Sequence, residues 1–69
     1  MNKKDILVNE IKIALPEVVA YQQKKGYFDF DFGYNMITNT WECSFFDQNG
    51  DVVEEFNGTD SWKSIVANF

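Results

Sequence analysis

Carboxylates supply most of the reactive side chains of this sequence. The chain has 11 Asp and Glu residues and one cysteine but no histidine, so it lacks the commonest general base of enzymes and the nucleophile pairs that depend on it. Asp29 and Asp31 have the two-residue spacing that places both carboxylates on one face of a strand, where such a pair can do acid–base work. In so acidic a chain these neighbours arise from composition alone. We therefore predict no catalytic residues and no enzyme.

A cation site is the second chemistry to consider. Residues 47–51 read Asp-Gln-Asn-Gly-Asp and are followed by Glu54 and Glu55, so oxygen ligands alternate as they do in calcium loops. The established loop has its glycine after the third acidic position, whereas Gly50 precedes Asp51. An Asn-Gly pair between two apolar runs instead predicts a hairpin turn. We expect neither a metal ion nor a cofactor.

Cys43 and the N-terminal segment bear on where the protein works. A lone cysteine forms no disulfide within the chain, and small secreted domains usually have several. Asp5 and Glu10 interrupt what would be the apolar part of a signal peptide, and no run approaches the roughly 18 to 20 apolar residues that cross a bilayer. We expect a cytoplasmic protein without membrane contact, with Cys43 as a small core residue.

Charge is unevenly distributed along the chain. Residues 1–25 have five lysines and three acids, whereas residues 26–60 have eight acids and no lysine. Arginine, the usual residue for bidentate phosphate or guanine contacts, is absent, so we expect no direct binding to nucleic acid. The eight acids are Asp29, Asp31, Glu42, Asp47, Asp51, Glu54, Glu55 and Asp60.

Length and periodicity predict one α+β domain over residues 1–69. Apolar residues recur at three- and four-residue steps from Leu7 to Tyr21, which predicts an N-terminal helix that ends near Gly26. Pro16 predicts either a kink in this helix or a division into two short helices. At the other end, Trp62, Ile65, Val66 and Phe69 predict a second helix that runs to the C-terminus, with Thr59 or Asp60 as its N-cap after a turn at 57–60.

Three strands are predicted between the helices. Residues 27–34 alternate strictly, 40–46 alternate again, and 52–56 follow the Asn-Gly turn. A two-residue turn pairs Phe45 with Glu54, while a three-residue loop with a bulge would place Val53 and Glu55 on the core face. The fold that results is a two-layer arrangement of helix, three-stranded antiparallel meander and helix, with both helices on one face of the sheet. The predicted core face comprises Phe28, Phe30, Phe32, Tyr34, Trp41, Cys43, Phe45, Val52 and Phe56.

The opposite, open sheet face is the candidate functional surface. It is either an ordinary solvated face or a binding surface. The second interpretation rests on its composition, because charge of one sign steers a basic partner and exposed aromatic residues then anchor it. The residues predicted to bind the partner are Tyr27, Asp29, Asp31, Glu42, Phe46 and Glu55.

Two functions fit such a surface. The first is an inhibitor or nucleic-acid-mimicking decoy that covers the basic surface of a nucleic-acid-handling protein, with carboxylates in place of phosphates. Small acidic counter-defence proteins of phages and mobile elements have this general character. The alternative is a structural or accessory protein without catalytic function that self-associates as a homodimer through a sheet edge or through Tyr27 and Phe46.

Overall fold

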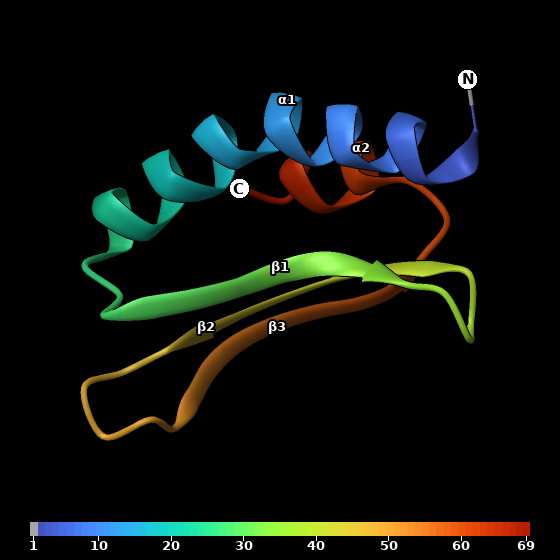
Figure 1. Ribbon diagram of the computed structural model, residues 1–69. Helices are drawn as coiled ribbons and strands as arrows, with labels where there is room; N and C mark the ends of the chain where they lie inside the picture. Colours follow the sequence, from blue (N-terminus) through green and yellow to red (C-terminus); the bar gives the residue numbers. More distant parts are fainter. Residues whose placement is uncertain (1) are drawn as a thin grey trace.

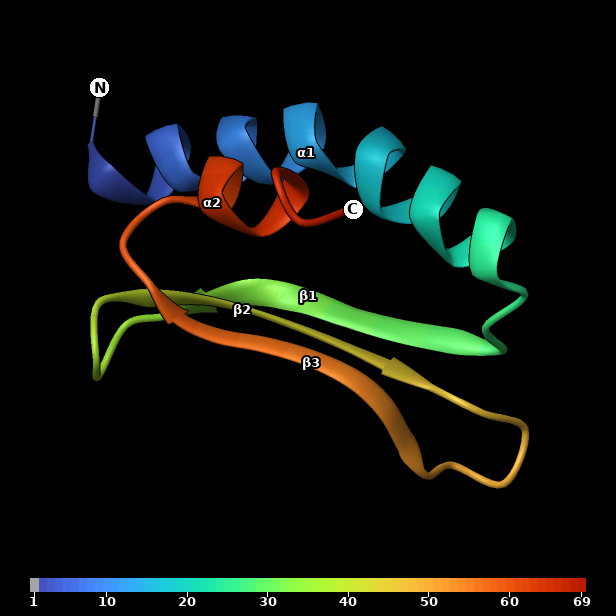
Figure 2. The same cartoon turned by 180° about the vertical axis from the view of Figure 1, so that it is seen from behind.

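Two helices cover one face of a three-stranded sheet (Figures 1 and 2). The structure is a computed structural model and describes residues 2–69. This confirms the predicted α+β arrangement of helix, antiparallel meander and helix, with both helices on the same face. The elements are α1 (Lys3–Lys25), β1 (Asp29–Asn35), β2 (Thr40–Phe46), β3 (Val52–Thr59) and α2 (Trp62–Val66).

Helix α1 is one continuous helix of 23 residues and is not divided at Pro16. Its first turn is capped by Asn2, whose side chain accepts a hydrogen bond from the backbone N–H of Asp5 at 3.0 Å. At the other end Gly26 adopts a left-handed conformation with φ of 72°, as predicted. Pro16 has no backbone N–H to donate. The helix stays continuous because a stripe of its side chains, which includes Val18, is buried against the sheet.

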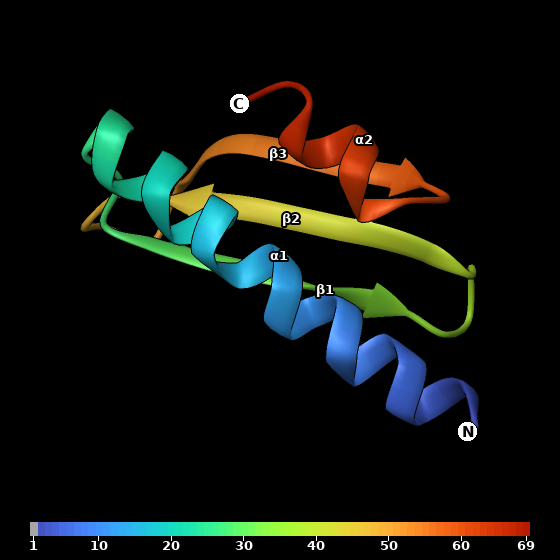
Figure 3. The same ribbon diagram turned by 90° about the horizontal axis from the view of Figure 1, so that it is seen from above.

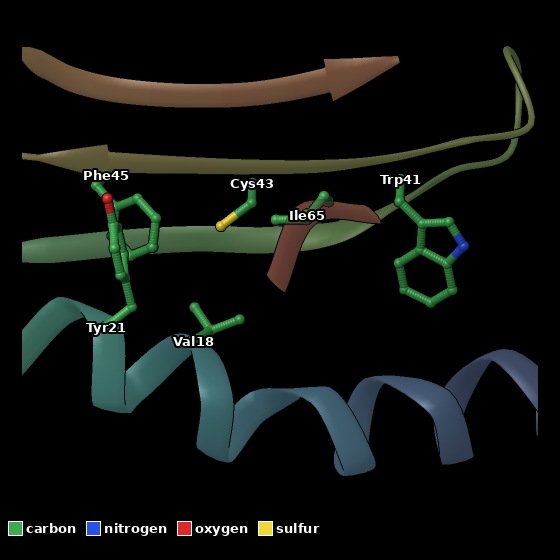
Figure 4. Packing of buried hydrophobic residues seen from close by; sticks show 6 residues of the cluster. All are labelled: Val18, Tyr21, Trp41, Cys43, Phe45 and Ile65. Atoms are coloured by element: carbon green, nitrogen blue, oxygen red, sulfur yellow. The ribbon is translucent and has the colours of Figure 1, made fainter. Parts of the chain in front are cut away.

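Strand β2 lies in the centre of the sheet and provides three of the seven buried core residues. Trp41, Cys43 and Phe45 are buried, as their alternation predicted. Helix α1 lies over β1, and α2 lies over β2 and β3 (Figure 3). Figure 4 shows side chains from both helices pointing at those of β2. The core therefore forms between the helix layer and one face of the sheet.

The β2–β3 hairpin combines features of both predicted turns. Phe45 pairs with Glu54, which is the register of the two-residue loop. The turn itself has a three-residue loop, because the N–H of Asp47 bonds to the carbonyl of Asp51 at 2.9 Å while Gly50 has a left-handed φ of 84°. The register shift next to Phe46 absorbs the extra residue. Val52, which was predicted to be in the core, consequently pairs with Phe46 and is exposed.

The start of the first strand differs from the prediction. Strand β1 begins at Asp29, after a bend at Phe28, so strict alternation fails for the two preceding residues. Tyr27 packs against the core and Phe28 is 68% exposed, the reverse of the predicted placement. The cause is the left-handed turn at Gly26, because the chain must reverse from the helix layer before it can enter the sheet.

The end of the third strand also differs. Residues 57–59, predicted as a turn, belong to β3, and the register shift opposite Trp41 is accommodated where Gly58 has φ of 78°. Ser61, not Thr59 or Asp60, is the N-cap of α2 and accepts from the N–H of Lys63 at 3.2 Å. The prediction of a turn at 57–59 was wrong because a β-bulge with glycine and a turn favour the same residues.

The C-terminal segment seals the core. Helix α2 has five residues and ends before the C-terminus, so it is shorter than predicted. Ile65 is buried, and the ring of Phe69 stacks on that of Tyr21 with centroids 4.2 Å apart. In the described part of the chain, neither helix has the length and apolar character that crossing a membrane requires.

The Cys43 thiol is expected to react only when the protein unfolds. Burial, together with the negative charges of Asp31 and Glu54, raises its pKa to about 12. Because the thiolate is the nucleophile, an aromatic disulfide reagent at pH 8 should label the native protein at least about 100-fold more slowly than the protein in urea. Rapid labelling without denaturant would contradict this burial.

Candidate functional site

The outer face of the sheet, which lies opposite the helices, collects five of the six predicted site residues. Cross-strand pairing places residues on this face, because directly opposed residues share a side of the sheet. Asp29 pairs with Phe46, and Asp31 pairs with Ser44, which in turn pairs with Glu55. Glu42 pairs with Gly33. We call the surface formed by Asp29, Asp31, Gly33, Glu42, Ser44, Phe46 and Glu55 the outer face.

Tyr27 is the sixth predicted site residue and does not belong to the outer face. Its ring packs against Phe45 with centroids 5.3 Å apart, on the core side of the sheet. Its hydroxyl lies 3.5 Å from Oε1 of Glu54 and donates to it. Tyr27 therefore lies on the core side of the sheet, and the prediction that places it on the open face is wrong.

Glu54 faces the core side between two tyrosines. The hydroxyl of Tyr21 also donates to Oε1 of Glu54. This hydrogen bond, together with burial and the negative charge of the carboxylate, raises the pKa of Tyr21 to about 12. The pKa of Tyr27 is raised by burial and by the same carboxylate. These contacts explain why an acidic residue lies at a core-facing register position.

The two layers of the molecule have opposite charge. All six lysines belong to the helices, which contain three acids and therefore have a net charge of +3. The strands and their connections contain the other eight acids and no lysine, a charge of −8 that accounts for the −5 of the chain. Figure 3 shows the helix layer stacked over the sheet. The uneven distribution of charge along the sequence thus gives the helices a net positive charge and the strands with their connections a net negative charge.

Hydrogen bonds orient two of the four carboxylates of the outer face, Asp29 and Glu42. Oδ1 of Asp29 accepts from the N–H of Phe30 at 2.8 Å, and Oε1 of Glu42 accepts from Nδ2 of Asn35 at 3.1 Å. A hollow of about 280 Å³ lies beside Glu42. It is lined by Asp31, Gly33, Tyr34, Asn35 and Glu42.

A larger hollow lies at the hairpin end of the sheet. It has a volume of about 450 Å³, and we call it the hairpin hollow; its lining consists of Phe28, Asp29, Phe46 and residues 47–50. A further hollow of about 560 Å³ shares Phe28 and residues 47–49 with it. Sequence reasoning missed Phe28 because its alternation with Phe30 and Phe32 is indistinguishable from that of a core residue. The only available signal was Gly26, which ends α1 too close to Phe28 for a regular strand to begin.

Within residues 2–69, no group of three or more Cys, Asp and Glu side chains is arranged to hold a metal ion. Compared with models of known protein families, with curated proteins and with solved structures, the chain matches none.

Proposed function

We propose that the protein is a non-catalytic binding module whose outer face covers the basic, nucleic-acid-binding surface of a protein partner in the cytoplasm. It acts there as an inhibitor or decoy of the counter-defence type. The observation that carries the proposal is the segregation of charge between the layers, +3 on the helices and −8 on the strands and connections. A surface with charge of one sign steers an oppositely charged partner and fixes its orientation.

The geometry of the outer face supports this role. Asp31, Ser44 and Glu55 form a row across the three strands, so two carboxylates flank a central hydroxyl. Neighbouring strands lie about 4.8 Å apart, which gives the face a rigid array of acceptors. Phosphate oxygens bind Lys and Arg through the same charge-assisted hydrogen bonds as carboxylate oxygens do. The outer face thus offers a basic surface the acceptors that it would otherwise find on nucleic acid.

Self-association is the alternative function, and charge limits the surfaces that it can use. A two-fold dimer built on the outer face would set this acidic surface against the same acidic surface of the second copy. The edge of β3 contains two register shifts, which hinder the addition of another strand. The edge of β1 is regular over its seven paired residues and is the surface that a homodimer would use.

The test of the proposed function is capture of a partner from host lysate on immobilised protein, followed by displacement with duplex DNA. The face variant is Asp29→Asn/Asp31→Asn/Glu42→Gln. The control variant, Glu10→Gln/Glu17→Gln/Asp60→Asn, changes net charge equally but leaves the outer face intact. Each exposed pair is worth about 0.2 to 1 kcal/mol, so the face variant should bind about 3- to 150-fold more weakly than the wild type.

The expected result is one basic protein that wild type and control variant retain, that the face variant loses, and that DNA or moderate salt releases. Equal loss with both variants would reduce the effect to net charge and overturn the proposal. Retention by the face variant would overturn it as well. Sedimentation of the same samples tests the alternative, because a homodimer dissociates on dilution.

A further inference from the structure

Phe28 is the most unexpected side chain on the surface. Its ring is 68% exposed, although Tyr27 before it and Phe30 two residues after it pack against the core. The backbone of Phe28 is held in place, because its N–H donates to the carbonyl of Phe46 at 3.0 Å. A large exposed aromatic ring on a fixed backbone marks a contact site more often than a scattered aliphatic residue does.

The hairpin hollow places this ring among carboxylates. Phe28 and Phe46 provide its apolar lining, and Asp29 and Asp47 its charge. Both carboxylates are oriented by the backbone: Oδ1 of Asp29 accepts from one N–H, and Oδ1 of Asp47 accepts from the N–H groups of Asn49 and Asp51 at 2.9 and 3.0 Å. The hollow therefore combines aromatic surface with two fixed negative charges.

We propose that the hairpin hollow binds an arginine side chain of the protein partner. A guanidinium is planar, stacks on aromatic rings and pairs with carboxylates through two hydrogen bonds, so it matches both parts of the lining. The inference rests on the proposed function and names the residue by which the basic partner is anchored. The carboxylates of the outer face then steer the partner, while Phe28 and Phe46 hold one of its arginines.

The test is a titration of ¹⁵N-labelled protein with the terminally blocked peptides Gly-Arg-Gly, Gly-Lys-Gly and Gly-Gln-Gly. We expect the arginine peptide to shift amide signals of Phe28, Asp29 and residues 46–50, with saturation at millimolar concentration. Phe28→Ala should weaken this binding about 2- to 5-fold, which is the contribution of a cation–π contact at an exposed site. Asp29→Asn, which keeps the acceptor oxygen, should weaken it as well.

Ile37→Ala is the matched control. Ile37 is 92% exposed in the β1–β2 turn, at the opposite end of the sheet from Phe28, and its replacement should leave the titration unchanged. The inference is overturned if the lysine or glutamine peptide binds as well as the arginine peptide, or if Phe28→Ala binds like the wild type. Such a result would leave the proposed function intact as long as the face variant still loses its partner in the capture experiment. Failure of the arginine site and failure of the proposed function are therefore distinguishable.

Discussion

A Phe45→Ala variant is expected to lose about 3 to 5 kcal/mol of its free energy of unfolding. Phe45 is fully buried and lies at the centre of the aromatic cluster, with ring centroids 5.2 Å from Tyr21, 5.3 Å from Tyr27 and 6.0 Å from Phe69. Truncation of a buried Phe costs about 3 to 5 kcal/mol, because the transfer free energy is lost and a cavity remains. A domain of this size has a total stability of only about 3 to 10 kcal/mol.

Phe28→Ala is the natural control for this variant. It removes the same atoms from a ring that is 68% exposed, so the free energy of unfolding should change by less than about 0.5 kcal/mol. Urea unfolding followed by the fluorescence of Trp41 and Trp62 measures both variants. Similar midpoints for the two would show that the core does not depend on Phe45. The control also establishes that the variant used to test the hairpin hollow is folded.

A Tyr21→Phe variant is expected to lose about 1 to 2 kcal/mol of stability at pH 7. The substitution keeps the ring in place and removes only the hydroxyl that donates to Glu54. Hydrogen bonds to charged groups contribute about 1.5 to 3 kcal/mol, and partial access of water to Glu54 reduces this value. Tyr27 compensates poorly, because its hydroxyl lies 3.5 Å from the same oxygen.

The same variant provides an alkaline readout. The pKa of Tyr21 is raised from 10.0 to about 12 in the folded protein, so between these values the unfolded chain releases a proton that the folded chain keeps. Stability from this group is therefore complete below pH 10 and is lost as the pH rises toward 12. Between pH 9 and pH 11, the urea midpoint should fall further in the wild type than in Tyr21→Phe.

Tyr34→Phe is the control for this hydroxyl. The Tyr34 hydroxyl donates to Oδ1 of Asn39 at 3.3 Å in an exposed position, so its removal should be nearly neutral at pH 7. Equal effects of the two substitutions would contradict a special role for the Tyr21–Glu54 contact. Glu54→Gln, which keeps an acceptor oxygen but removes the charge, separates hydrogen bonding from electrostatics.

Local patterns in the sequence determined the elements and most of the outer face. Alternation over residues 40–46 depends only on the two-residue period of a strand, and it identified Trp41, Cys43 and Phe45 as core residues. The same period places Asp29, Asp31 and Glu42 on the outer face. These patterns hold wherever the chain forms a regular strand, because the side chain's direction then follows from its position alone.

Only the tertiary structure decided the irregular junctions. Tyr27 and Phe28 exchange sides because the chain must bend between Gly26 and β1, and a bend breaks the period on which alternation depends. Glu54 faces the core because it pairs with Phe45, but only the fold brings the hydroxyl of Tyr21, 33 residues away, to its carboxylate. The hairpin hollow, likewise, brings Phe28 beside a loop that is about twenty residues distant in the chain. Contacts between distant segments leave no local pattern, so the exposed ring of Phe28 and the partly buried Tyr21–Glu54 pair became visible only in the folded molecule.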